Sequence, residues 1–172
     1  MSNAVPLPAG TTLGKSFEYG IDVNLGTYDV PVWQPFRRIS GFQPSPTPTM
    51  QDGRPYAGGG AQNMRVIGWS MNIAFNSQVN RSMTTGEYLP EVEAVLARTG
   101  PTAIGELAVL DARWYHRPET GAPNPSDAGQ GLFTVVATRQ NSGPNGELEI
   151  LAITLTGKGE YEKIVNPFPG RD

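Results

Sequence analysis

Residues 64–79, Met64-Arg-Val-Ile-Gly-Trp-Ser-Met-Asn-Ile-Ala-Phe-Asn-Ser-Gln-Val79, carry the clearest structural pattern in the chain. From residue 67 to residue 75 an apolar side chain stands at every second position, which is typical of a strand with one buried side. The apolar face is expected to join a core, whereas the opposite face is small, neutral and polar. The predicted core residues are Trp69, Met71, Ile73 and Phe75, and the polar ones are Ser70, Asn72, Asn76 and Gln78.

The sequence around this stretch predicts a mainly β domain with one flanking helix. Further strands are expected over residues 17–25, 30–42, 104–115, 132–141 and 147–158. A helix is expected at about 88–99, where Val92 and Leu96 recur at helical spacing and are predicted to be core residues. Gly100-Pro101 would end it. Such a short helix needs a sheet to pack on, so the expected fold is a β-sandwich.

Three segments lack such periodicity. Residues 1–14 are expected to form an N-terminal arm and residues 159–172 a C-terminal arm, on either side of a domain spanning 15–158. Residues 43–63, rich in proline and glycine, are expected to form a long loop. A loop of that length commonly serves binding or assembly.

Composition narrows the function classes. The 172 residues include 21 Gly and 16 Pro, and only 17% are charged, which excludes a coiled coil and a highly charged disordered chain. The net charge of −3 and the absence of a cluster of basic residues argue against binding to the phosphate backbone of nucleic acid. The chain has no cysteine and no long apolar stretch, so neither a disulfide nor a membrane-spanning segment is expected. Synthesis in the cytoplasm is expected.

The sequence offers little for catalysis. His116 is the only histidine, and its place at the end of a strand favours a surface role. Gly58-Gly-Gly60 is followed by no Lys-Ser or Lys-Thr pair, so it is interpreted as loop rather than as a phosphate cradle. Glu147 and Glu149 could pair as in a glycoside hydrolase, but nothing else supports hydrolysis. We therefore expect no enzyme activity, no catalytic residue, no metal site and no cofactor.

The layout resembles the major tail tube proteins of long-tailed, siphovirus-type bacteriophages. The matching features are Val32-Trp-Gln-Pro-Phe-Arg-Arg-Ile-Ser-Gly-Phe-Gln-Pro-Ser-Pro, the long loop, the amphipathic strand, the helix after Thr84-Thr-Gly-Glu-Tyr-Leu-Pro and the final hairpin. The resemblance extends over nearly the whole chain, but the family has no invariant ligand motif to check. It implies hexameric rings that stack into a tail tube in the virion, through which DNA passes without specific binding. The implied partners are further copies of the chain, a tape measure protein and tail-terminating or tail-tip proteins.

This reading assigns roles to two sets of residues. Sheet edges are expected to pair between neighbouring copies, and the neutral polar face is expected to line the lumen. The lumen-lining candidates are Glu149, Glu147, Asp111, Ser70, Asn72, Asn76 and Gln78. The candidates for contacts between stacked rings are Pro44, Pro46, Pro48, Met50, Asp52, Arg54, Tyr56 and Phe168.

Two alternatives stay open at this stage. One is the inner tube protein of a contractile injection system, which shares the fold. The other, from a different class, is a monomeric carbohydrate-binding sandwich, which would need exposed aromatic side chains on one strand face.

Overall fold

The computed structural model describes residues 5–53, 62–141 and 143–170, and within these ranges the chain is mainly β. One α-helix, α1 (Pro90–Leu96), and a 3-10 turn (Gly105–Ala108) separate β4 from β5. The strands are β1 (Tyr19–Asn24), β2 (Trp33–Pro35), β3 (Ile39–Asp52), β4 (Met64–Gln78), β5 (Val109–His116), β6 (Ala128–Gln140), β7 (Ile150–Gly157) and β8 (Glu162–Lys163).

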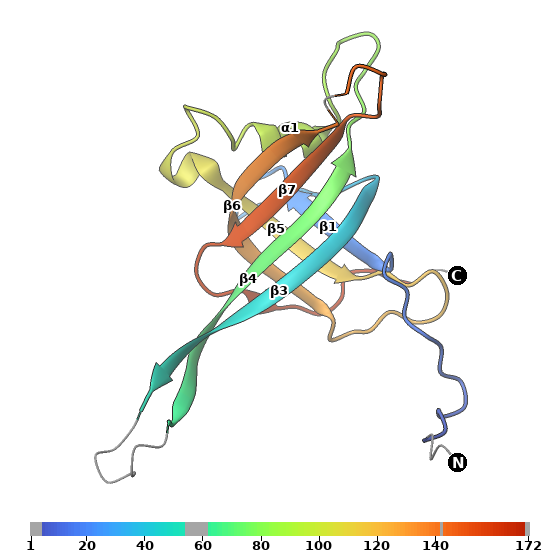
Figure 1. Ribbon diagram of the computed structural model, residues 1–172, viewed down its shortest axis with the longest axis vertical. Helices are drawn as coiled ribbons and strands as arrows, with labels where there is room; N and C mark the ends of the chain where they lie inside the picture. The colour runs from blue at the N-terminus through green and yellow to red at the C-terminus, as the bar shows by residue number, and fades with distance from the viewer. Residues whose placement is uncertain (1–4, 54–61, 142, 171–172) are drawn as a thin grey trace.

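The strands form one antiparallel sheet that curls around the core. Their order is β2-β1-β5-β6-β7-β4-β3, and the short β8 pairs with β6. In Figure 1 the strands β3, β4, β7 and β6 lie in front of β5 and β1, so two halves of the sheet face each other. Side chains connect the two edges of the sheet closely, because Tyr19 of β1, the neighbour of the edge strand β2, stacks on Phe42 of the edge strand β3 with 5.6 Å between ring centroids. The fold is sandwich-like, as the sequence predicts.

The core fills the space between these halves and extends to the helix. Met71, Ile73 and Phe75 of β4 and Val92 of α1 are buried, and Leu96 packs against them from a partly buried position. The other large, fully buried core side chains are Ile21, Val23, Val95, Leu110, Phe133, Leu151, Ile153 and Leu155.

Trp69 is the exception among the predicted core residues, because 46% of it is exposed. Its position in β4 places it on the same side of the strand as Met71, two residues later. However, β4 pairs with β7 only from Asn72 to Gln78. Before Asn72, β4 pairs with β3 alone and extends past the end of the domain. The apolar face therefore continues beyond the layer that would cover it, which alternation alone cannot reveal.

The expectation of a long loop over residues 43–63 is wrong for much of its length. β3 continues to Asp52 and β4 begins at Met64, and the two strands form a hairpin that projects from the domain (Figure 1). β3 lies at the edge of the sheet, where the N–H groups of alternate residues point away from the neighbouring strand. Pro44, Pro46 and Pro48 are spaced by two, so all three fit the positions whose N–H would point to the free edge. The residues between them can direct their N–H groups toward β4.

Other boundaries move by a few residues for local reasons. Helix α1 begins at Pro90, which suits the first helical position because proline lacks the N–H that would be unpaired there. The expected strand over 104–115 begins only at Val109, after the 3-10 turn. The expected strand over 147–158 begins at Ile150, which leaves Glu147 and Glu149 in the preceding turn.

Residues 159–170, expected as a free C-terminal arm, lie against the domain. Tyr161 packs on Trp114 with 5.7 Å between ring centroids, and β8 extends the sheet at β6. The Asn166 side chain donates hydrogen bonds to the backbone oxygens of His116 and Asn124, at 2.7 and 3.0 Å. These contacts within the chain give the segment partners that its composition did not indicate.

Candidate functional site

A neutral polar surface covers the outer side of β3, β4, β7 and β6. Residues that face each other directly in neighbouring strands share one side of the sheet, and Asn72 aligns with Thr156 and Thr134 in this way. Residues 43–49, 70–78, 134–138 and 152–156 contain no charged side chain. We call this surface the neutral face; its outward residues are Ser45, Thr47, Ser70, Asn72, Ala74, Asn76, Thr134, Val136, Thr138, Ala152, Thr154 and Thr156.

The predicted lumen-lining residues separate into two groups. Ser70, Asn72, Asn76 and Gln78 share the outward side of β4, and the structure brings them together with the threonines of β6 and β7. The carboxylates lie elsewhere. Glu147 and Glu149 occupy the turn between β6 and β7, where Glu149 forms an exposed ion pair with Arg139.

Asp111 faces the same side of the sheet as the neutral face, one strand beyond β6. It aligns with Leu132 and is half-buried, and its oxygens accept hydrogen bonds from the side chains of Asn24 and Gln130 at 3.1 and 3.4 Å. Burial raises the pKa of the Asp111 carboxyl, which these hydrogen bonds and nearby Arg113 oppose. It therefore belongs to a polar network rather than to an open channel wall in the isolated chain.

An ion-paired network on β1 and β5 borders this region, and sequence reasoning missed it. The Arg113 guanidinium donates to Asp22 at 2.8 Å, and the Tyr115 hydroxyl donates to the other Asp22 oxygen at 2.8 Å. Arg113 also lies over the Trp33 ring at 4.6 Å. Burial, followed by the negative charge of Asp22, raises the pKa of Tyr115. Asp22 alternates with apolar residues along β1, and the sequence pattern does not reveal its partners because they lie on β5, 91 and 93 residues further along the chain.

The hairpin gathers most of the predicted ring-stacking residues. Pro44, Pro46, Pro48, Met50 and Asp52 all lie on β3. Arg54 and Tyr56 lie outside the described residues. The distal part of the hairpin exposes several large apolar side chains without cover from the domain: Met50, Met64, Val66 and Ile67. Apolar groups exposed in this way favour burial against another surface.

Phe168, the remaining stacking candidate, packs on its own chain. Its ring is stacked on Tyr115 with 6.5 Å between centroids, and the Arg117 guanidinium lies 5.5 Å from its centre. Phe168 is held there by the same Asn166 turn that binds the 116–124 region. Phe168 thus has partners within the single chain, and its contact with a neighbouring ring stays a prediction.

His116 has a local structural role. Its Nδ1 accepts a hydrogen bond from the Asn124 backbone N–H at 3.1 Å, and its Nε2 lies 3.9 Å from a Glu18 oxygen. Within residues 5–53, 62–141 and 143–170, no cluster of three or more His, Asp or Glu side chains is suited to a metal ion. No helix in the same ranges combines the length and the apolar character needed to cross a bilayer.

Comparison with known proteins supports the fold. The chain is similar to one chain of the anti-feeding prophage baseplate, determined by cryo-electron microscopy with six-fold symmetry imposed. The TM-score is 0.51 at 15% sequence identity, and the alignment covers 92% of this chain and 99% of the other. No protein family model matches the sequence, and no curated protein matches it. The similarity therefore extends over most of the fold.

Proposed function

We propose that this protein is a structural subunit of a phage tail or a related tail-like particle. In this proposal six copies form a ring, and the rings stack into a tube that serves as a conduit for the genome. The observation that carries the proposal is the neutral face, which spans four adjacent strands opposite a closed apolar core. The similarity to a chain of a six-fold symmetrised baseplate supports a place in such an assembly.

The chemistry of the neutral face suits the wall of a water-filled channel. Threonine, serine and asparagine side chains bind water, and without positive charge they do not hold the phosphates of passing DNA. Aromatic side chains are absent from the outward positions of residues 43–49, 70–78, 134–138 and 152–156, so this surface offers no stacking platform for a sugar. A conduit therefore fits this surface better than a carbohydrate-binding module, and we infer no enzyme activity for the chain.

The hairpin supplies the proposed contact between stacked rings. It projects beyond the domain and carries exposed apolar side chains on both strands, of which Met50 and Val66 lie directly opposite each other. An isolated two-stranded hairpin is only marginally stable in water. Burial against the next ring would give this segment the apolar partner it lacks.

Electron microscopy of the purified protein tests the assembly directly. We expect rings with six-fold symmetry, or tubes, in negative stain. A variant in which residues 50–67 are replaced by Asn-Gly joins the paired residues Thr49 and Gly68 through a two-residue hairpin turn. This variant should stay folded by circular dichroism and form no long tubes. A dispersed monomer at all concentrations in the unmodified protein would contradict the proposal.

Chemical labelling tests the channel assignment separately. The chain has no cysteine, so Thr154→Cys introduces one reactive thiol at the centre of the neutral face. In assembled tubes this thiol should react with a small maleimide and not with a maleimide on a bulky carrier, while the monomer reacts with both. Equal reaction of tubes with both reagents would place the neutral face on the outside.

A further inference from the structure

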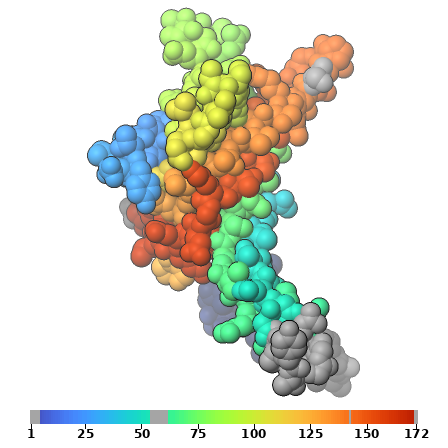
Figure 2. All heavy atoms as spheres, turned by 90° about the vertical axis from the view of Figure 1, so that its left-hand side faces the viewer, coloured from blue at the N-terminus to red at the C-terminus, as the bar shows by residue number. Residues whose placement is uncertain are grey.

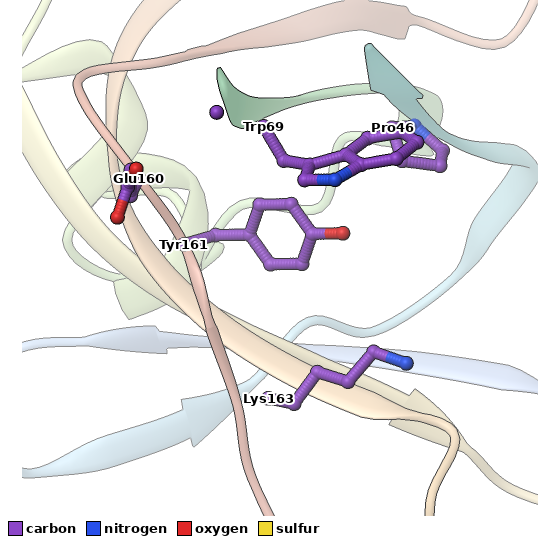
Figure 3. A pocket seen from close by; sticks show the side chains of 6 residues that line it. Pro46, Trp69, Glu160, Tyr161 and Lys163 are labelled. Atoms are coloured by element: carbon purple, nitrogen blue, oxygen red, sulfur yellow. The ribbon is translucent and has the colours of Figure 1, made fainter. Parts of the chain in front are cut away.

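A groove lies where the hairpin meets the domain, and Trp69 forms its centre. One cavity of about 540 Å³ is lined by Pro46 and Trp69 on the hairpin side and by Glu160, Tyr161 and Lys163 on the other (Figure 3). A second cavity of about 340 Å³ shares Gly68, Trp69 and Glu160 with the first and also reaches Ile67. We call these two cavities together the Trp69 groove. Its walls combine aromatic rings, proline and aliphatic groups with one acidic and one basic side chain.

The domain side of the groove is fixed by the core. The Tyr161 ring packs against Trp114, which is 4% exposed, and the Tyr161 Cβ approaches Gly131 of β6 closely. Lys163 belongs to β8 and aligns with Gly129 of β6. This wall of the groove is therefore preformed, and an occupant would bind to it without first ordering it.

The N-terminal arm has the matching chemistry. Its residues Val5-Pro-Leu-Pro8 are all exposed, with Val5 at 89% and Leu7 at 78%. Each of these two residues precedes a proline, which restricts both to extended or polyproline conformations. Proline-rich segments of this kind bind aromatic-lined grooves, because the extended backbone is preformed and loses little entropy.

The positions of the arm and the groove favour binding between copies. In Figure 1 the N-terminal arm leaves the right-hand side of the domain, whereas the hairpin and the turn between β7 and β8 lie on the left. Figure 2 shows this left-hand side, with the segment after β7 beside β4. Two complementary patches on different sides of one molecule produce head-to-tail contacts, which close into rings or continue as filaments. Extended, residues 5–14 can reach about 33 Å from the domain.

We infer that Val5–Pro8 of one copy binds the Trp69 groove of a neighbouring copy. This inference rests on the proposed self-assembly and names the segment and the surface that join two copies. Trp69 and Tyr161 contact the proline rings. Leu7 enters the larger cavity, of about 540 Å³, which Lys163 also lines. Each copy then offers one arm and one groove, so the contact repeats around or along the assembly and gains strength from multivalency.

Cross-linking between single-cysteine variants tests this contact with the full chain. Leu7→Cys and Lys163→Cys proteins are prepared separately, mixed and oxidised, so that a mixed disulfide can form only between two copies. Leu13→Cys is the matched control for the arm, because Leu13 is 82% exposed and lies outside the proline segment. Leu148→Cys, 70% exposed in the turn between β6 and β7, is the control for the groove. We expect the Leu7–Lys163 product to exceed both control products, and Trp69→Ala in the groove partner to reduce it about tenfold.

Microscopy of the same samples separates this inference from the proposed function. Rings or tubes with the Leu7–Lys163 product support both. Rings or tubes without that product, or with equal yield in the control pairs, overturn the arm-in-groove contact and leave the proposed function standing. The product without any ring or tube supports the contact and contradicts the proposed function. Absence of both product and assembly overturns both.

Discussion

The two tryptophans Trp69 and Trp114 provide the sharpest test of where the core ends. Each is replaced by alanine in a separate variant. Trp114 is 4% exposed and contacts Phe133 with 5.9 Å between ring centroids, whereas Trp69 is 46% exposed on the projecting part of β4. Both residues come from strands and both carry the same side chain, so the comparison isolates burial.

The structure sets the size of the expected difference. Truncation of a fully buried tryptophan removes its burial and leaves a cavity, at a cost of about 3–5 kcal/mol, which we expect for Trp114→Ala. A fully buried aromatic covers about 150–250 Å², and roughly half of that area at about 25 cal/mol per Å² gives about 2–3 kcal/mol for Trp69. This is an upper bound, because the site opens to water and truncation leaves no sealed cavity. We therefore expect Trp69→Ala to cost about 1–2 kcal/mol.

Urea unfolding followed by far-ultraviolet circular dichroism measures both free energies of unfolding, since this signal does not depend on the deleted indole. The protein concentration is kept where size-exclusion chromatography shows a monomer, because assembly would add to the apparent stability. Equal losses in the two variants would show that Trp69 belongs to the core of the single chain. That result would refute both the exposed groove and its role in binding a second copy.

Three further outcomes are expected. Gly157→Ala should destabilise the protein by about 1–3 kcal/mol in urea unfolding, because the new Cβ would lie 2.6 Å from a backbone oxygen of β4. Gly14→Ala is the control: a Cβ at Gly14 would have no atom within 4 Å, so the free energy of unfolding should change little. Asp111→Asn should raise the thermal midpoint at pH 7 and give no gain at pH 3. Burial raises the pKa of the Asp111 carboxyl in the folded protein above its ordinary 3.8. The stabilisation from the protonated carboxyl is therefore complete below pH 3.8 and is lost as the pH rises through the folded pKa. Replacing Glu147 and Glu149 by Gln should leave tubes intact in electron micrographs and the salt dependence of genome ejection unchanged, because both residues lie in the turn before β7 and Glu149 pairs with Arg139; a changed salt dependence would show that these carboxylates face the passing DNA.

The sequence predicts the mainly β fold, the helix and the apolar face of β4 because each depends on local periodicity. The burial of Met71, Ile73 and Phe75 follows from alternation along a strand that the sheet then covers. The exposure of Trp69 could not be predicted in the same way. Whether a given residue of β4 pairs with β7 or lies beyond its end depends on the register between two strands that are about eighty residues apart in the sequence.

The candidate site was predictable only in part. The small polar residues of β4 identified one strand of the neutral face, but its width depends on threonines of β6 and β7 that align with them only in the folded sheet. Glu149 was a lumen-lining candidate on the expectation that a strand spans residues 147–158. The turn instead places it beside Arg139, whose charge compensates its own. A charge in a turn has its partner set by the turn geometry, which residue spacing does not encode.

The proline spacing in β3 changes how the proposed ring can close. A strand from another copy needs both N–H donors and carbonyl acceptors along the edge with which it pairs. Pro44, Pro46 and Pro48 have no backbone N–H, so the free edge of β3, away from β4, offers only acceptors along this stretch. Regular sheet pairing between copies across this stretch is therefore disfavoured, contrary to the expectation that sheet edges pair between neighbours. At the other edge β2 has three residues and pairs with β1 over Asp22–Asn24, so β2 is also a poor template. In the proposed ring, contacts between copies would then depend largely on side chains and extended segments, which is the kind of contact that we infer for the N-terminal arm and the Trp69 groove.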